Sequence, residues 1–130
     1  MKYILITILS FTVASVFAQK EIKIDEAENH PGETVKICTK IYGGKSILNA
    51  RDTLTLLDAG KPYPDAPLRL VIKGKAQSEF TGDIVKYYRG MNVCISGKIE
   101  LYKGKPEIKI TDKAQIFEQT KDQIDLQEPK

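Results

Sequence analysis

The chain has 130 residues, of which 28% are charged and 42% hydrophobic, and its formal net charge is +3. That length is enough for one domain with a single modest core and leaves no room for a second domain. The only histidine, His30, precedes a proline in a predicted turn, which argues against a Ser-His-Asp, Cys-His or multi-histidine zinc site.

Residues 1–18 are typical of a signal peptide. A basic start at Lys2 is followed by an apolar run from Tyr3 to Phe17, and Val16-Phe17-Ala18 fits the small-residue rule for cleavage. The run is shorter than the roughly 20 residues that span a bilayer. We expect a periplasmic or secreted protein that begins at Gln19 and has no stable membrane insertion; a retained membrane anchor is the alternative.

Basic residues concentrate in the middle of the chain. Between Thr34 and Lys113 the sequence holds 15 Lys and Arg against 8 Asp and Glu, whereas the segments from Gln19 to Glu33 and from Ala114 to Lys130 are both net acidic. This asymmetry predicts a basic surface for an acidic partner, although a mixed-charge surface that only aids solubility would give the same composition.

The first predicted elements are an arm and a strand. The N-terminal arm covers residues 19–33 and includes a short helical turn capped by Asp25. The first strand is predicted from Thr34 to Tyr42, because apolar and polar side chains alternate there. We expect Gly43-Gly44-Lys45 to form the turn that follows it.

Two further strands flank a proline-rich loop. The second is predicted from Arg51 to Leu57, with Leu54 and Leu56 directed inward. The loop from Gly60 to Pro67 cannot continue a hydrogen-bonded ladder. The third strand is predicted from Leu68 to Lys73. Its outward side chains are Arg69, Val71 and Lys73.

At the start of the second half of the chain, the spacing of the apolar residues changes from that of a strand to that of a helix. Between Gln77 and Arg89 the apolar residues recur at spacings of three and four, which predicts one short helix. The fourth strand is predicted from Met91 to Tyr102 and the fifth from Pro106 to Thr111. Residues 118–130 hold few apolar side chains and are expected to form a disordered acidic tail.

Three strands, a short helix and a hairpin therefore follow one another over residues 34–117. That order is the plan of the OB (oligonucleotide/oligosaccharide-binding) barrel. We expect an all-β fold, a five-stranded OB-type Greek-key barrel with one short helix between its third and fourth strands.

The two cysteines, Cys38 and Cys94, lie on the polar faces of the first and fourth predicted strands. These strands are antiparallel neighbours in an OB barrel, where opposite residues place their Cβ atoms about 4.5–5.5 Å apart, close to what a disulfide needs. We predict a structural Cys38–Cys94 disulfide, which suits an oxidising compartment. A redox-active pair is disfavoured because there is no Cys-x-x-Cys spacing.

Three stretches carry a resemblance to known proteins: Gly32 to Val35, Gly60 to Pro64, and Gly90 to Ile108. They resemble small exported bacterial OB-fold proteins described only as candidate nucleic-acid-binding proteins. The last stretch is also similar to the strand-4 to strand-5 hairpin of anticodon-binding OB domains. The resemblance covers roughly residues 24–117 and implies the fold. It does not imply one ligand, because OB barrels bind nucleic acids, sugars, proteins and ions.

OB domains that hold single strands use the face of strands two and three and the loops beside it. In this chain the basic residues of that region are Lys45, Arg51, Arg69, Lys73, Lys103 and Lys105. They could neutralise the phosphates of an anionic polymer, for which we favour single-stranded nucleic acid over polysaccharide. Tyr63 is the nearest candidate for base stacking, and the alternative is that it packs on Pro62 and Pro64 to stiffen the loop.

The remaining class of function is an enzyme with the same barrel fold. Exported calcium-dependent nucleases of the staphylococcal type need carboxylates for the metal and arginines for the phosphate. Arg51-Asp52-Thr53 and Pro64-Asp65-Ala66-Pro67 match fragments of that pattern, but Leu68 stands where an acidic residue is needed, so a general base is missing. Asp52, Asp58 and Asp65 are better explained as strand-end and turn residues. We therefore expect a binding protein with no cofactor and no metal, and not an enzyme. The alternative is a protein-interaction or envelope-stress module of the periplasm.

Overall fold

The computed structural model describes residues 20–48, 53–122 and 124. The predicted signal peptide, the expected start at Gln19, Arg51 and the end of the tail lie outside the described residues. In the described part seven strands form one sheet: β1 (Lys20–Glu21), β2 (Thr34–Leu48), β3 (Thr53–Ala59), β4 (Leu68–Lys73), β5 (Asn92–Tyr102), β6 (Lys105–Ile110) and β7 (Ile116–Glu118). The short helices are α1 (Lys75–Ser78), α2 (Ile84–Tyr88) and the 3-10 helices η1 (Ile24–Asn29) and η2 (Lys113–Gln115). The chain is mostly β, as predicted.

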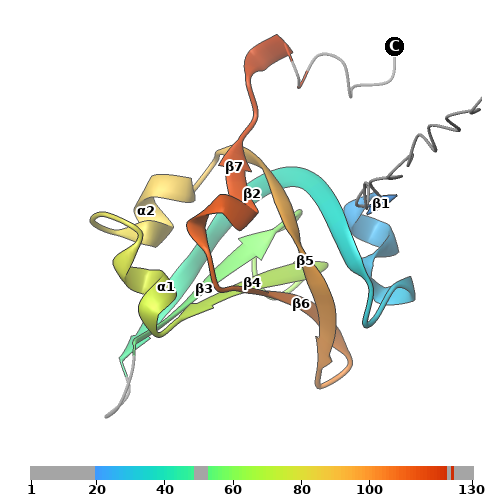
Figure 1. The fold of residues 1–130 in the computed structure, drawn as a ribbon, viewed down its shortest axis with the longest axis horizontal. Helices are drawn as coiled ribbons and strands as arrows, with labels where there is room; N and C mark the ends of the chain where they lie inside the picture. The colour runs from blue at the N-terminus through green and yellow to red at the C-terminus, as the bar shows by residue number, and fades with distance from the viewer. Residues whose placement is uncertain (1–19, 49–52, 123, 125–130) are drawn as a thin grey trace, which may run out of the picture.

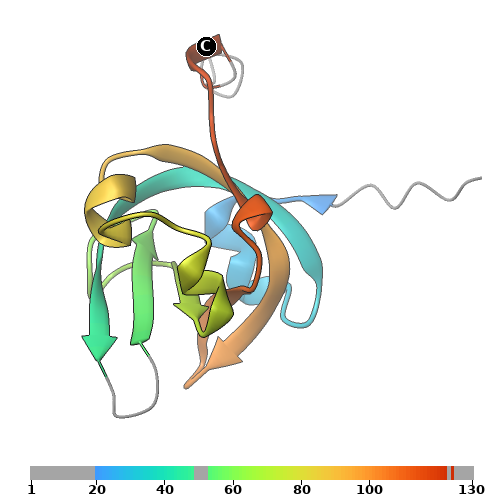
Figure 2. The same ribbon diagram turned by 60° about the vertical axis from the view of Figure 1, so that its left-hand side comes forward.

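The strand pairings close on themselves. They run from β2 through β3, β4 and β6 to β5, and β5 pairs again with β2. Every pair in this circuit is antiparallel except β4 with β6. This is the connectivity of an OB fold. β1 adds to β2 and β7 adds to β5, so the prediction of five strands leaves out two short edge strands. In Figure 1, α1 and α2 lie on the left of the sheet and η1 on the right, and Figure 2 shows the same arrangement turned.

The core fills the inside of this closed sheet. Its side chains alternate along the strands, as one buried face requires. The inward residues of β4 are Leu68, Leu70 and Ile72, as predicted, and all three are fully buried. The largest fully buried side chains in the other strands are Ile37, Ile41, Leu57, Ile95, Ile99, Ile108 and Ile110.

β2 is longer than predicted. It continues to Leu48, so the predicted turn at Gly43-Gly44-Lys45 is wrong. A shift of register just after Ile41 marks a bulge that bends β2, whose first half pairs with β5 and whose second half pairs with β3. A Cβ at Gly44 would lie 2.0 Å from the backbone oxygen of Leu56. The glycine therefore allows a close approach of two strands and does not make a turn.

The predicted alternation in β3 is wrong by one residue. Leu57 and Ala59 belong to the core, and Thr55 is buried with its hydroxyl donating to Oε1 of Gln77 at 3.0 Å. Leu54 and Leu56 therefore face the outside of the barrel. The run of Leu and Thr is compatible with either phase, and the register against β4 selects one of them.

Two helices stand where one was predicted. α1 and α2 are separated by a turn at Gly82, which has a φ of 72°, and Asp83 caps α2 by accepting from the Lys86 N–H at 3.0 Å. In the N-terminal arm Asp25 lies inside η1 and does not cap it, because the N-cap position is Lys23, which makes no side-chain cap. Both corrections concern single turns, where local sequence signals are weakest.

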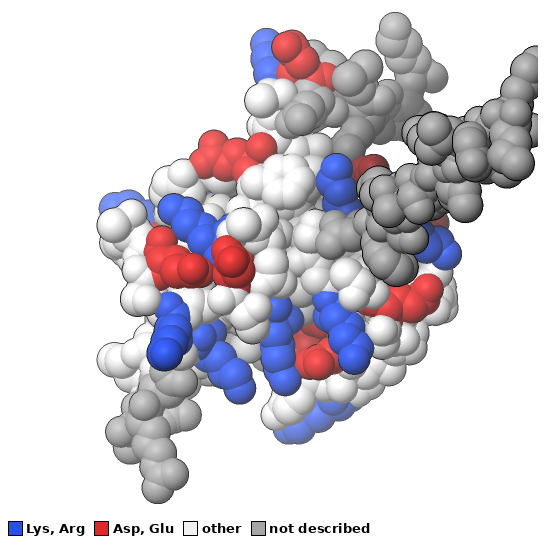
Figure 3. All heavy atoms as spheres, in the orientation of Figure 1, with Lys and Arg blue, Asp and Glu red and all other residues white. Residues whose placement is uncertain are grey.

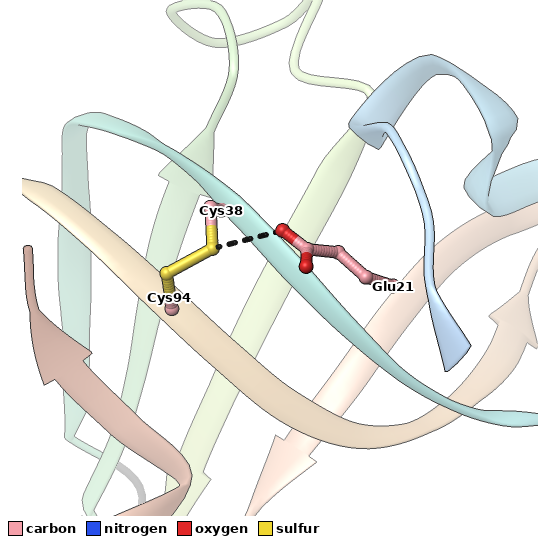
Figure 4. Close-up of a disulfide and its surroundings, with 3 residues drawn as sticks. All are labelled: Glu21, Cys38 and Cys94. Carbon is pink, nitrogen blue, oxygen red and sulfur yellow. Dashed lines mark hydrogen bonds between the residues drawn. A yellow bond between two sulfur atoms is a disulfide. The ribbon is translucent and has the colours of Figure 1, made fainter. Parts of the chain in front are cut away.

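The predicted disulfide is confirmed. Cys38 of β2 lies directly opposite Cys94 of β5, with Cα atoms 4.0 Å apart and an S–S bond of 2.03 Å (Figure 4). A carboxylate oxygen of Glu21 lies 3.8 Å from Sγ of Cys38. A disulfide sulfur has no hydrogen to donate, so this is a contact between the β1 arm and the bridge.

Candidate functional site

A groove of about 650 Å³ crosses the outer face of β2, β3, β4 and β6 and reaches the end of β5. It is lined by Lys45, Ile47, Leu54, Leu56, Arg69, Val71, Lys73, Tyr102, Glu107 and Lys109. The groove lies on the face of the second and third predicted strands, where the sequence predicts the binding site.

Two apolar pairs line the groove across neighbouring strands. Ile47 of β2 lies opposite Leu54 of β3, and Leu56 of β3 lies opposite Val71 of β4. Leu56 and Val71 are each 8% exposed, whereas Ile47 is 37% exposed. Apolar side chains that are grouped on an outer face provide a surface that a ligand can cover.

Four cations line the same groove: Lys45, Arg69, Lys73 and Lys109. Nζ of Lys109 lies 3.1 Å from a carboxylate oxygen of Glu100, whereas Lys45 and Lys73 form no ion pair with any described residue. In Figure 3 Lys and Arg side chains gather along the lower part of the face that is shown, with an acidic patch among them. Nε of Arg69 lies 3.7 Å from Oδ1 of Asp58. The groove therefore combines an apolar surface with two cations, Lys45 and Lys73, that have no ion pair within the described residues.

Glu107 is an acidic residue among the basic residues that line the groove. It lies opposite Arg69 in the β4–β6 ladder and opposite Glu100 in the β5–β6 ladder, and its carboxyl group forms no hydrogen bond or ion pair with a described residue. Burial raises the pKa of Glu107 above its ordinary 4.5, and Glu100 adds to the rise. Lys109, Arg69 and Lys73 lower the pKa in part. The groove thus contains one carboxyl group that is easier to protonate than usual.

A smaller pocket of about 170 Å³ adjoins the groove and shares Lys45, Leu56 and Arg69 with it. Its other lining residues are Gly44, Asp58 and Tyr63, and we call it the Tyr63 pocket. Nζ of Lys45 lies 5.6 Å and Cζ of Arg69 5.5 Å from the centre of the Tyr63 ring, both within the range of cation–π attraction. Tyr63 is 64% exposed, so these contacts leave much of its ring open.

The β5–β6 hairpin borders the groove near Tyr102. Its two-residue turn consists of Lys103 and Gly104, with φ values of 51° and 79°, the positive angles that a tight antiparallel hairpin favours. Nζ of Lys103 lies 5.5 Å from the Tyr102 ring centre. Alternation along the predicted fourth strand puts Leu101 on the inner face with Ile99, but Leu101 is 48% exposed, so that prediction is wrong.

The structure thus brings together part of the predicted site. Lys45, Arg69 and Lys73 line the groove, and Tyr63 joins them through the adjoining pocket. Lys103 and Lys105 lie on the hairpin next to Tyr102 and do not line the groove, and Arg51 lies outside the described residues.

Sequence reasoning missed further lining residues, namely Ile47, Leu54, Leu56, Tyr102, Glu107 and Lys109. The leucines were missed because the phase of β3 was reversed. Alternation in the predicted fifth strand already set Glu107 and Lys109 apart from the inward Ile108 and Ile110, and that signal would have found them.

The other features of the described residues add little chemistry. A cavity of about 80 Å³ lies beside α2 and is lined by Phe80, Thr81, Ile84, Tyr87, Tyr88 and Lys113. Within the described ranges there is no group of three or more His, Cys, Asp and Glu residues that could hold a metal ion. None of the helices described is long and apolar enough to cross a membrane.

No family model and no curated protein matches the chain. Among solved structures, the chain is similar to the second OB-fold domain of replication protein A from Methanococcus maripaludis, with 17% identity, a TM-score of 0.48, and coverage of 78% of this chain and 96% of that one. It is also similar to a protein described as an aspartyl-tRNA synthetase from Leishmania major Friedlin, with 9% identity and a TM-score of 0.47. That similarity covers 83% of this chain and 22% of the other. Neither likeness says what this chain binds, and the narrower group of exported bacterial proteins stays a prediction.

Proposed function

We propose that the chain is an exported binding protein that holds a single-stranded nucleic acid in the groove, and that it is not an enzyme. In this proposal β2 to β6 act as a five-stranded OB-type barrel, to which β1 and β7 add short edges. The observation that carries the proposal is the composition of the groove. Two cross-strand aliphatic pairs, four cations and Tyr102 line it, and Tyr63 stands in the adjoining pocket.

A single strand matches this composition because it offers the faces of its bases and its phosphates at the same time. In a duplex the base faces are stacked inside and only the edges and backbone are accessible. Tyr63 and Tyr102 would stack on bases, a contact that contributes about 1–3 kcal/mol per base. The aliphatic pairs would cover other bases, and the cations would lie against the phosphates. An uncharged polysaccharide would leave the cations without a role.

Export rests on two independent features. Residues 1–18 read as a signal peptide, and the Cys38–Cys94 disulfide is typical of proteins in an oxidising compartment. If the proposal is correct, protein recovered from the exported fraction should have a mass that corresponds to a start at Gln19. A mass that includes Lys2 would contradict export.

A protein partner is the second candidate, and the aliphatic pairs favour it. Ile47 with Leu54, and Leu56 with Val71, could also cover the apolar side chains of a peptide that lies across the strands. Such a partner would use the cations only at its own acidic residues, so its binding would be less sensitive to salt than that of a nucleic acid.

Fluorescence anisotropy with a labelled single strand of about 12 nucleotides, within the usual site size of an OB barrel, tests the proposal. We expect binding at low salt by protein that starts at Gln19, and much weaker binding of the corresponding duplex. The double variant Lys45→Glu/Lys73→Glu should weaken binding at least about tenfold, because it reverses two cations of the groove. Neither lysine is ion-paired with a described residue, so the reversals leave no internal charge without its partner.

The matched control is Lys98→Glu, which makes the same change of charge on an exposed residue of β5 outside the groove. It should leave the affinity nearly unchanged. Absence of binding at low salt, or equal weakening by the control and by the groove variant, would reject the nucleic-acid proposal and favour a protein partner.

A further inference from the structure

The Tyr63 pocket lies where the groove meets the loop that joins β3 to β4. Leu56 belongs to both cavities, whereas Asp58, two residues further along β3, lines only the pocket. The loop behind it is packed in place, because a Cβ at Gly60 would lie 2.7 Å from Ile24 of η1 and 2.8 Å from Pro67. A nucleic-acid strand that follows the groove in this direction therefore reaches Tyr63 on that loop.

The charges of the pocket are arranged around one buried carboxylate. Asp58 is only 7% exposed, and its Oδ1 lies 3.7 Å from Nε of Arg69. This contact uses the inner edge of the guanidinium, and the two outer nitrogens form no hydrogen bond with a described residue. The ammonium group of Lys45 likewise has no ion pair or hydrogen bond with a described residue. Two cations and one carboxylate leave the pocket with a net positive charge.

The inference drawn from these observations rests on the proposal that the groove binds a single strand, and it specifies one part of that ligand. We propose that the Tyr63 pocket binds the terminal phosphate of that strand, so that the groove selects a strand with a phosphorylated end. Arg69 holds the phosphate with its outer nitrogens, Lys45 adds the second charge, and Asp58 is a positioning residue that orients the guanidinium.

The chemistry of the pocket favours a monoester over an internal phosphodiester. A guanidinium matches the geometry of phosphate oxygens with two parallel N–H groups. A terminal phosphate carries between one and two negative charges near neutral pH and three free oxygens, whereas an internal phosphodiester carries one charge and two free oxygens. Since a water molecule occupies about 30 Å³ in the liquid, a pocket of about 170 Å³ has room for a group of several heavy atoms.

The test compares three single strands of identical sequence, with hydroxyl ends, with a 5′-phosphate and with a 3′-phosphate. We expect one of the two phosphates to tighten binding about tenfold, which is the lower range for hydrogen bonds to a charged group. Lys45→Gln should remove most of this preference. Lys73→Gln, which changes a cation of the groove outside the pocket, should weaken binding of all three strands by the same factor and keep the preference.

Arg69 needs a paired substitution, because Arg69→Gln alone would leave Asp58 buried beside a neutral group. The double variant Asp58→Asn/Arg69→Gln removes both charges and should abolish the preference; it should also weaken binding of all three strands by a common factor, because Arg69 lines the groove as well as the pocket. Asp58→Asn alone should reduce the preference in part, since the guanidinium remains but is less well oriented. A preference that survives in both Lys45→Gln and the double variant would overturn the proposal.

A monomeric probe separates this inference from the groove proposal. In NMR titrations, thymidine monophosphate should shift signals of Gly44 and Tyr63. Thymidine should shift them much less, because it offers a base to Tyr63 but no phosphate to the pocket. If the hydroxyl-ended strand binds and neither phosphate strengthens it, the terminal-phosphate inference is wrong and the groove proposal stands. If the monophosphate shifts these signals while no strand binds, the pocket inference stands and the groove proposal fails.

Discussion

Glu107 is acidic, in contrast to every other charged residue that lines the groove in the described part of the chain. Burial raises the pKa of its carboxyl group because the charged form loses water that no hydrogen-bond partner among the described residues replaces. In its charged form it repels a phosphate, and in its protonated form it does not. The affinity of the groove for an anionic ligand should therefore depend on this one proton.

We expect Glu107→Gln to bind single-stranded DNA about two- to fivefold more tightly near neutral pH, the size of effect of one partly exposed charge. As pH falls toward and through the raised pKa of Glu107, the wild-type carboxyl becomes neutral and binding should strengthen. The variant has no such proton to gain, so its affinity should change less over the same range. Dissociation constants measured between about pH 7 and pH 4.5 check this, with Glu26→Gln in η1 as a control that lies outside the groove. Parallel pH profiles for wild type and Glu107→Gln would contradict the assignment.

At Gly44 the choice of residue is limited by the available space and not by charge. A Cβ at this position would lie 2.0 Å from the Leu56 backbone oxygen, and backbone atoms of β3 cannot move aside as a flexible side chain can. Gly44→Ala should therefore reduce the free energy of unfolding by about 1–3 kcal/mol, as overpacked sites do. Urea denaturation measures this. Ser46→Ala, two residues further along β2 and exposed, should change it by less than about 0.5 kcal/mol.

At the scale of elements, β2 does most to shape the molecule. Its first half pairs with β5 and carries the disulfide, and its second half pairs with β3 and carries Lys45 and Ile47 of the groove. The bulge after Ile41 separates the two halves. Because the disulfide and part of the groove lie on the same strand, a change at the disulfide affects an element that borders the groove.

We expect Cys38→Ser/Cys94→Ser to lower the free energy of unfolding by about 2–4 kcal/mol, since the bridge closes a loop with a sequence separation of 56 residues. Urea denaturation of the variant and of the wild type with a reductant should give the same value. Thiol labelling of the denatured, non-reduced wild type should find no free cysteine. Two labelled thiols would show that the bridge does not form.

At the scale of the whole molecule, positive charge is concentrated between two acidic flanks, and the closed sheet brings four of these cations to one groove. Their positions come from β2, β4 and β6, which are separated along the chain. The total charge of the protein is only +3, so its attraction for an anionic polymer depends on this local arrangement more than on the net value.

If the four cations meet phosphates, the logarithm of the binding constant for single-stranded DNA should fall with the logarithm of salt concentration with a slope no steeper than about −3, at about −0.7 per phosphate. Lys73→Gln should reduce the slope by about 0.7. Lys109→Gln should reduce it less, because Lys109 is already paired with Glu100. Titrations at several salt concentrations give the slopes. A slope near zero in the wild type would exclude phosphate contacts as a main source of affinity.

Much of the fold could be predicted from local patterns. The alternation in β4 and the pairing of Cys38 with Cys94 follow from which residues share one face of a strand. Arg69 and Lys73 share the outer face of β4 for the same reason, whereas Lys45 was expected in a turn and lies within β2. These features depend on neighbours along the chain or on one pair of strands.

The order of the strands, the faces of the regular strands and the basic character of the central segment follow from local sequence. The phase of β3, the continuation of β2 through two glycines and the contact of Tyr63 with Lys45 and Arg69 depend on how distant strands pair. Leu54 to Leu57 satisfy a core in either phase, and Gly44 is compatible with a turn or a close strand contact. In each case a partner strand distant in sequence makes the choice, through its register and its backbone atoms.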